Sequence, residues 1–159
     1  MKQDKFLLVV LLAITGLVLL SLVIFFIRRG SQEYSPESSP LGVVRNYVLA
    51  LQKGDYPRAY AYLAEQQGKP DFEHFQSDFL TLKREILNVS VQLGSMEQTG
   101  EQALVFLSII HPGNGPFGDV WREDTNALLS RDGTGSWTIT RMPYPFWGVT
   151  WYPIKPPNP

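Results

Sequence analysis

A run of 22 residues without a charged side chain, from Phe6 to Ile27, is the feature that most constrains this chain. As an α-helix the run would be about 33 Å long, which matches the hydrocarbon layer of a bilayer. A helix buried in a soluble core seldom stays apolar on every face over so many turns. The run therefore predicts a single-pass membrane anchor over residues 1–29, with the lipid bilayer as the partner of Phe6 to Ile27.

A cleaved signal peptide is the closest alternative for this run. Its apolar region would be about 7–15 residues long and would be followed by a small-residue cleavage site. Here the run is longer and ends in the bulky and charged stretch FFIRR, at residues 25–29. These features favour an uncleaved signal anchor.

The charges beside the run give little information about orientation. Lys2 and Lys5 precede the apolar run, whereas Arg28 and Arg29 follow it, so the positive-inside bias nearly cancels. We expect a short tail in the cytoplasm and the following domain outside it, although Arg28 and Arg29 argue against this orientation.

The rest of the chain divides by composition into a linker and a domain. Residues 30–39 are rich in Ser, Pro and Glu, which is typical of a tether, and residues 40–159 form the predicted domain. Residues 31–159 carry ten basic and fourteen acidic side chains without a basic cluster, which argues against binding of nucleic acid. The absence of cysteine excludes disulfides, thiol nucleophiles and thiolate metal sites.

Three helices are predicted at the start of the domain, each with a local start signal. Ser39 is the expected N-cap of the first helix, and Gly54 is expected to end it. Asp55 can cap a second helix, and Asp71 can cap a third, whose apolar positions continue to Ile86.

The pattern then changes to that of strands. Apolar and polar residues alternate over 89–93, and further strands are predicted at 103–110, 120–130 and 137–142. The 103–110 segment is apolar on both faces, so we expect a central strand covered above and below. Helices followed by an antiparallel sheet indicate an α+β fold.

A G-x-G-x-x-G pattern at Gly113, Gly115 and Gly118 raises the question of a nucleotide cofactor. Such a loop must lead from a strand directly into a helix, whose N-terminus holds the pyrophosphate. Pro116 lies inside the pattern, and the following residues alternate like a strand. We therefore interpret the stretch as a wide turn between two strands, and we expect no cofactor.

The segment 39–63 resembles the nuclear-transport-factor-2-like superfamily, and in particular its small membrane-tethered or lipoprotein members of unknown function. The resemblance covers about residues 40–145 and implies a cone, in which three helices pack on a curved antiparallel sheet with a pocket at the open end. Members include isomerases, dehydratases, ligand binders and association modules, so the resemblance indicates fold and not activity. The short strand expected between the helices is not evident in the sequence. The residues that carry the resemblance are Val44, Tyr47, Leu51, Gly54, Asp55, Ala59, Tyr60 and Leu63.

Enzymes of this fold use an Asp or His base in the pocket, and three polar residues are candidates for that role. His111 follows the second predicted strand, and Glu123 and Asp124 fall on opposite faces of the third, so one of the two should point inward. A cross-strand charge pair of one of them with Arg141 is the alternative. Two histidines without a carboxylate cluster form no metal site.

Aromatic side chains are the stronger functional signal. Aromatic walls are typical of sites for small apolar ligands, whereas a core filled with rings is the alternative explanation. The tail from Met142 is rich in Pro and aromatic residues, and we expect it to pack over the sheet and not to lie at the membrane interface. The pocket candidates are Tyr47, Tyr60, Phe75, Phe79, Trp121 and Trp137.

These observations favour a membrane-anchored, non-catalytic binding or association domain. One alternative is an isomerase- or dehydratase-like enzyme that acts on a small apolar ligand in the cone pocket. Another is a structural accessory subunit of a membrane complex. The expected partners besides lipid are a small apolar ligand or a protein, including a second copy of the chain bound through the sheet.

Overall fold

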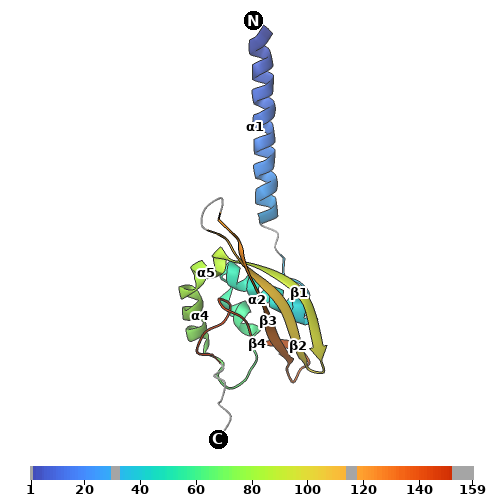
Figure 1. The fold of residues 1–159 in the computed structure, drawn as a ribbon, viewed down its shortest axis with the longest axis vertical. Helices are drawn as coiled ribbons and strands as arrows, with labels where there is room; N and C mark the ends of the chain where they lie inside the picture. The colour runs from blue at the N-terminus through green and yellow to red at the C-terminus, as the bar shows by residue number, and fades with distance from the viewer. Residues whose placement is uncertain (1, 30–32, 114–117, 152–159) are drawn as a thin grey trace. The chain divides into compact units, whose positions relative to one another are not determined.

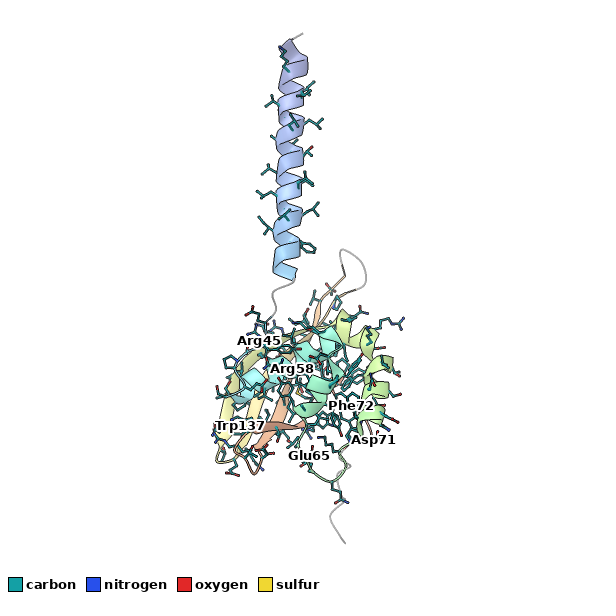
Figure 2. All side chains as sticks on the ribbon, turned by 180° about the vertical axis from the view of Figure 1, so that it is seen from behind. Arg45, Arg58, Glu65, Asp71, Phe72 and Trp137 are labelled. Carbon is teal, nitrogen blue, oxygen red and sulfur yellow. The ribbon has the colours of Figure 1, made fainter. Side chains whose placement is uncertain are left out.

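The computed structural model describes residues 2–29, 33–113 and 118–151, and its contacts divide the chain into two compact units, Met1–Glu33 and Tyr34–Pro159. The first unit contains the helix α1 (Lys2–Arg29), in which Leu7–Phe25 has a mean hydropathy of 3.1. Side chains project from α1 in all directions, and none of this window is buried (Figure 2). By length and composition α1 can cross a membrane, a property that signal sequences share.

The first two helices of the domain begin at the predicted caps, and the first also ends at the predicted Gly54. Ser39 Oγ accepts a hydrogen bond from the Gly42 N–H at 3.1 Å and caps α2 (Pro40–Lys53). Gly54 ends this helix in the left-handed conformation, with φ of 74°. Asp55 Oδ1 accepts from the Arg58 N–H at 3.3 Å and caps α3 (Tyr56–Ala61).

The third predicted helix is in fact two helices, so that prediction was wrong. Asp71 caps α4 (Phe72–Thr81) as expected, but the helix ends at Leu82, where φ is −82° and ψ is 0°. A shorter helix, α5 (Lys83–Asn88), follows directly. The Thr81 hydroxyl donates to the Ser77 carbonyl at 3.1 Å, an interaction that often bends helices. Helical spacing of apolar residues continues through the break, so the sequence pattern did not reveal it.

The four strands that follow the helices form one antiparallel sheet in the order β1-β2-β3-β4 (Figure 1). The strands are β1 (Ser90–Thr99), β2 (Gln102–His111), β3 (Trp121–Arg131) and β4 (Trp137–Arg141). Register shifts between Leu93 and Met96, and between Leu128 and Leu129, bend the sheet. The predicted α+β architecture, helices on a curved antiparallel sheet, is confirmed.

In the described part of the chain, the helices cover one face of the sheet and leave the other without a helix. On β2 the side chains of Ala103, Val105, Leu107 and Ile109 are buried, whereas the alternate residues are only half-buried. The expectation that both faces of this strand are covered was therefore wrong. The outer face of β2 carries Leu104, Phe106, Ser108 and Ile110.

A short extended segment after α3 pairs with the edge of the sheet. Leu63 forms an isolated parallel bridge with Ile139, and the Ala64 N–H donates to the Ile139 carbonyl at 2.9 Å. This bridge stands where the resemblance implied a short strand between helices. One bridge leaves almost no alternating pattern, which explains why the sequence did not show it.

Part of the predicted linker belongs to the domain. The Ser35 N–H donates to Asn46 Oδ1 at 2.7 Å, and Asn46 Nδ2 donates to the Ser35 carbonyl at 2.8 Å. Residues 34–39 therefore pack on α2 and α3 and are not a free tether, while residues 30–32 lie outside the described residues.

The G-x-G-x-x-G pattern lies between two strands in the sequence, and residues 142–151 follow the last strand. β2 ends at His111 and β3 begins at Trp121, so the glycine pattern does connect two strands, although Gly115 and Pro116 lie outside the described residues. Residues 142–151 contain no helix or strand, and Phe146 and Trp151 from this segment are buried in the core. The tail thus packs on the domain as far as residue 151.

Candidate functional site

Aromatic rings from α2, α4 and the 142–151 segment pack together in the core. The rings of Phe75 and Phe79 have centroids 4.8 Å apart, and Trp151 stacks on Phe75 at 5.3 Å. Tyr47 meets Phe79 edge to face at 6.5 Å and donates a hydrogen bond from its hydroxyl to the Phe146 carbonyl at 2.9 Å. Tyr47, Phe75 and Phe79 are fully buried. An apolar ligand could reach these rings only if the 142–151 segment moved, so their role in ligand binding stays a prediction.

The other three aromatic candidates lie in different places. Tyr60 is half-buried and contacts Phe75 edge to face at 5.2 Å. Trp121 is 59% exposed at the start of β3, whereas Trp137 is buried beside the far end of that strand, in register with Arg131. The six aromatic candidates therefore do not line one common cavity in the described part of the chain.

The polar candidates separate onto the two faces of the sheet. His111 and Glu123 lie on the inner face at one end, with His111 Nε2 3.8 Å from Glu123 Oε2, and the His111 ring lies 4.6 Å from that of Trp121. Asp124 lies on the outer face and accepts a hydrogen bond from the Ser108 hydroxyl at 2.5 Å. Arg141 is in register with Leu128 and not with Asp124, so the alternative cross-strand pair with Asp124 does not form.

The interior offers little for acid–base chemistry. Apart from tyrosine and tryptophan side chains, Asn46 is the only polar side chain among the described residues that is buried, and its amide is used by Ser35. The side chains of His111 and Glu123 are 29% and 44% exposed, although His111 Nε2 itself is buried and has no hydrogen-bond partner among the described residues. In residues 2–29, 33–113 and 118–151, no three His, Asp or Glu side chains are grouped to hold a metal ion.

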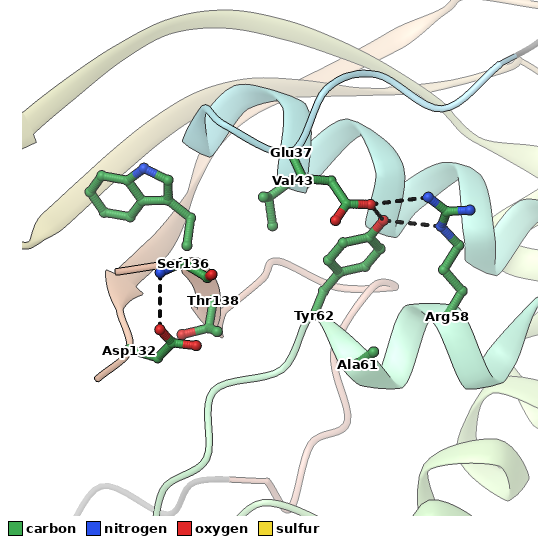
Figure 3. A pocket seen from close by; sticks show the side chains of 9 residues that line it. Glu37, Val43, Arg58, Ala61, Tyr62, Asp132, Ser136 and Thr138 are labelled. Carbon is green, nitrogen blue, oxygen red and sulfur yellow. Dashed lines mark hydrogen bonds and ion pairs between the residues drawn. The ribbon is translucent and has the colours of Figure 1, made fainter. Parts of the chain in front are cut away.

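A pocket of about 340 Å³ opens on another part of the domain, where the 34–39 segment meets α3 and the turn between β3 and β4 (Figure 3). Figure 3 shows Glu37, Arg58 and Tyr62 gathered on one side of it, and Asp132, Ser136 and Thr138 on the other. The volume is at the small end of the range for ligand sites. Its lining residues are Glu37, Val43, Arg58, Ala61, Tyr62, Asp132, Ser136, Trp137 and Thr138.

Three polar side chains form one connected group on the first side of the pocket. Glu37 Oε1 accepts a hydrogen bond from the Tyr62 hydroxyl at 2.6 Å and an ion-pair contact from Arg58 Nη2 at 3.0 Å. Arg58 Nε also donates to the Tyr62 oxygen at 3.1 Å, and the guanidinium lies 3.5 Å from the centre of the Tyr34 ring. The guanidinium is therefore held by a carboxylate, a hydroxyl and an aromatic face.

This group shifts the ionisation of its members. The Tyr62 hydrogen bond, with a further contribution from Arg58, holds the pKa of Glu37 below its ordinary value. The nearby Asn46 amide, whose own hydrogen bonds go to Ser35, lowers the Glu37 pKa slightly more. Burial, followed by the hydrogen bond to Glu37, raises the pKa of Tyr62. Glu37 is thus ionised and Tyr62 neutral at neutral pH.

A tight turn holds the carboxylate on the second side. Asp132 Oδ1 accepts hydrogen bonds from the Thr134 hydroxyl at 2.6 Å, and from the N–H groups of Thr134 and Ser136 at 2.9 Å each. These hydrogen bonds, that of the Thr134 hydroxyl above all, hold the pKa of Asp132 below its ordinary value. The turn therefore fixes a charged carboxylate at the edge of the pocket.

The strands predicted at 120–130 and 137–142 left residues 131–136 as their connection, but the sequence did not reveal the site beside it. Trp137 was the only lining residue among the candidates. Glu37 was assigned to a linker, and Arg58 and Tyr62 were part of a helix described only by its apolar positions. Glu37 and Tyr62 are 25 residues apart, and no local spacing signals such a contact.

Comparison of the structure with solved structures identifies the fold. No family model and no curated protein matches the sequence. A protein from Shewanella frigidimarina described as a ketosteroid isomerase matches with a TM-score of 0.50 and 18% identity, over 64% of this chain and 91% of that chain. A SEC-C motif containing protein from Rhodopseudomonas palustris matches with a TM-score of 0.48 and 11% identity, over 67% and 79%. An NTF2-like transpeptidase from Campylobacter jejuni matches with a TM-score of 0.46 and 14% identity, over 65% and 99%.

The Shewanella match, over 64% of this chain, together with the arrangement of helices on a curved sheet, shows that the domain that follows α1 has the nuclear-transport-factor-2-like fold. At 18% identity this similarity extends to the fold alone.

Proposed function

We propose that this chain is a single-pass membrane protein whose nuclear-transport-factor-2-like domain binds a ligand or partner without catalysing a reaction, outside the cytoplasm. The observation that carries the proposal is the packed interior. The rings of Phe75, Phe79 and Trp151 pack against one another in the interior, and Phe75 and Phe79 are fully buried. Catalysis in such a fold would require a carboxylate or imidazole that faces an apolar cavity and is tuned by burial.

The apolar helix supports the membrane part of the proposal. Leu7–Phe25 is 19 residues long, enough for the hydrocarbon layer, and belongs to a compact unit separate from the domain. We expect the full-length protein to stay in the membrane fraction after alkaline carbonate extraction and to dissolve in detergent. Release by carbonate would contradict the anchor. Protease added outside intact cells should digest the domain, and protection of the domain there would reverse the proposed orientation.

Fluorine NMR of the full-length protein tests whether the interior accepts a ligand. The chain has four tryptophans, which can be replaced by 5-fluorotryptophan and assigned from single Trp→Phe variants. Trp151 reports on the interior, whereas Trp137 reports on the surface pocket. We expect small apolar ligands to leave the Trp151 resonance unchanged. A saturable shift of Trp151, together with turnover of the ligand, would favour an isomerase- or dehydratase-like enzyme instead.

We also propose that a second copy of the chain binds the outer face of the sheet. Leu104, Phe106 and Ile110 lie half-buried at its centre, and Arg122 and Asp124 place both signs of charge on the same face. A two-fold axis would bring each charge near its opposite on the second copy. Phe106→Glu should abolish chemical cross-linking of the dimer in membranes. Leu87→Glu, an exposed position on α5, should leave it unchanged, and equal effects would contradict this interface.

A further inference from the structure

We infer that the pocket between Glu37 and Asp132 binds a cationic group, an ammonium or a guanidinium, of a ligand or of a partner's basic side chain. The inference rests on the proposed binding function, because it names the ligand chemistry of that domain. It concerns the surface pocket and not the aromatic interior.

The balance of charge in the pocket favours a cation. Two carboxylates and one guanidinium line it. The guanidinium of Arg58 is already paired with Glu37, bonded to Tyr62 and stacked on Tyr34. Arg58 therefore neutralises one carboxylate and is poorly placed to bind an incoming anion, so the lining side chains keep one unbalanced negative charge. Arg131, which does not line the pocket, lies over the ring of Trp137 at 4.8 Å.

The hydrogen bonds that hold each carboxylate in place end on one of its two oxygens. The hydrogen bonds to Glu37 end on Oε1, and those to Asp132 end on Oδ1. In the described part of the chain no hydrogen bond ends on Glu37 Oε2 or Asp132 Oδ2. A cation between the two sides of the pocket would meet these oxygens without breaking the bonds that hold the carboxylates in place (Figure 3).

Both carboxylates are charged at neutral pH. The pKa of each lies below its ordinary value, because both accept hydrogen bonds that favour the ionised form. Charge-assisted hydrogen bonds to ammonium or guanidinium are stronger than those between neutral groups. A neutral ligand could donate hydrogen bonds to these carboxylates but would leave their negative charge uncompensated.

The size and walls of the pocket fit one side chain or a small amine. A volume of about 340 Å³ is small for a ligand with fused rings. Val43 and Ala61 give the pocket an apolar wall, which suits the alkyl stem of lysine or arginine. A basic side chain would thus place its stem on the wall and its charge between the carboxylates.

The test uses the full-length protein in nanodiscs made of a neutral phospholipid, labelled with 5-fluorotryptophan. The probes are the single residues Nα-acetyl-lysine methylamide and Nα-acetyl-arginine methylamide. The Nε-acetylated lysine compound is the uncharged control, and inorganic phosphate is the anionic control. We expect the cationic probes to shift the Trp137 resonance saturably, with a Kd of about 1 mM, and to leave Trp151 unchanged.

Two variants that remove one negative charge each make the test specific. Glu37→Gln and Asp132→Asn should each weaken binding about fivefold. In Asp132→Asn the side-chain amide oxygen can still accept the turn hydrogen bonds. This variant therefore tests the inference even if Glu37→Gln displaces Arg58. Glu65→Gln removes an exposed carboxylate outside the pocket, paired with Lys69, and should leave the Kd unchanged.

Several outcomes would overturn the inference. One is a Trp137 resonance that does not shift at probe concentrations ten times the expected Kd. The others are an equal shift of this resonance with the acetylated lysine, and a shift with phosphate only. Unchanged affinity in both charge-removing variants would also overturn it. None of these outcomes affects the membrane extraction or the Trp151 test, so the proposed function can stand or fail separately.

Discussion

Trp151 donates a hydrogen bond from its indole Nε1 to Asp78 Oδ2 over 2.9 Å, and this bond connects the C-terminal segment to α4 across 73 residues of sequence. The same indole packs against Phe75 and Phe79 and is 5% exposed. The segment that follows β4 is therefore part of the core, and it occupies the interior of the fold. This relationship explains why aromatic residues that resemble a ligand site in the sequence form a packed cluster.

Removal of the indole should destabilise the domain strongly. Trp151→Ala is expected to lower the free energy of unfolding by about 3–5 kcal/mol, because it leaves a cavity beside Phe75 and Phe79. Trp151→Phe should cost about 1–3 kcal/mol, because it keeps part of the packing but loses the hydrogen bond to Asp78. Urea denaturation of the detergent-solubilised protein, followed by circular dichroism, measures both changes.

A nearby exposed ring provides the control for the Trp151 variants. Tyr144 belongs to the same segment and is 56% exposed, so Tyr144→Ala should change the unfolding free energy by less than about 0.5 kcal/mol. A cost below about 1 kcal/mol for Trp151→Ala would show that the segment contributes little to the core.

Gly54 should be intolerant of a side chain for conformational reasons alone. Its φ is 74°, and a Cβ built there meets no heavy atom within 4 Å, so a substitution causes strain but no clash. Gly54→Ala is expected to cost about 1 kcal/mol of stability. Gly133, which also has open space but no positive φ, is the matched control, and Gly133→Ala should be close to neutral. Equal effects in thermal unfolding would contradict the assignment of Gly54 as a left-handed helix end.

Asn46 should determine whether residues 34–37 stay bound to the domain. It is fully buried, and its amide both accepts from and donates to the backbone of Ser35. Asn46→Ala is expected to cost about 1–3 kcal/mol, because it leaves the Ser35 groups without these partners. A glutamate-specific protease should then cleave at Glu37 faster than in the unmodified chain. Arg45→Ala removes only an exposed bond to the Ser35 hydroxyl, and similar cleavage rates in both variants would refute the role of Asn46.

The parts of the fold that could be predicted depend on neighbours in sequence. Ser39, Asp55 and Asp71 each cap a helix through an N–H group three residues on, so short motifs were sufficient. The change from helical to alternating spacing likewise predicted the sheet. These signals are local, and the structure confirms them.

The parts that could not be predicted depend on contacts between distant residues. Glu37 and Tyr62 meet because 34–39 folds back on α2 and α3, although the composition of that stretch is typical of a tether. Trp151 and Asp78 meet only once the sheet has formed. The break at Leu82 is local, but it leaves the apolar spacing intact. Fold class was therefore accessible from the sequence, whereas the pocket at Glu37 and the filled interior were not.

Tyr34 and Tyr62, which both contact Arg58, should make the stability of the domain sensitive to alkaline pH. Burial raises the pKa of Tyr62 and of Tyr34, so the folded state favours the neutral phenols. Their contribution is fully present below the ordinary tyrosine pKa of about 10 and is lost as pH rises through the raised folded values. Glu37 acts in the opposite range, since its pKa is lowered: its contribution is present above about pH 4.5 and is lost as pH falls through the lowered value.

The variant Tyr62→Phe separates this effect from general alkaline unfolding. It removes one titrating phenol together with its hydrogen bond to Glu37, so it should cost about 1 kcal/mol at pH 7 and less at pH 11. The urea midpoint of the variant should therefore fall less steeply between about pH 9 and pH 11 than that of the unmodified protein. Tyr144→Phe, at an exposed position, should follow the unmodified curve. Parallel curves for Tyr62→Phe and the unmodified protein would mean that the Tyr62 phenol titrates equally in the folded and unfolded states, which contradicts its burial beside Glu37.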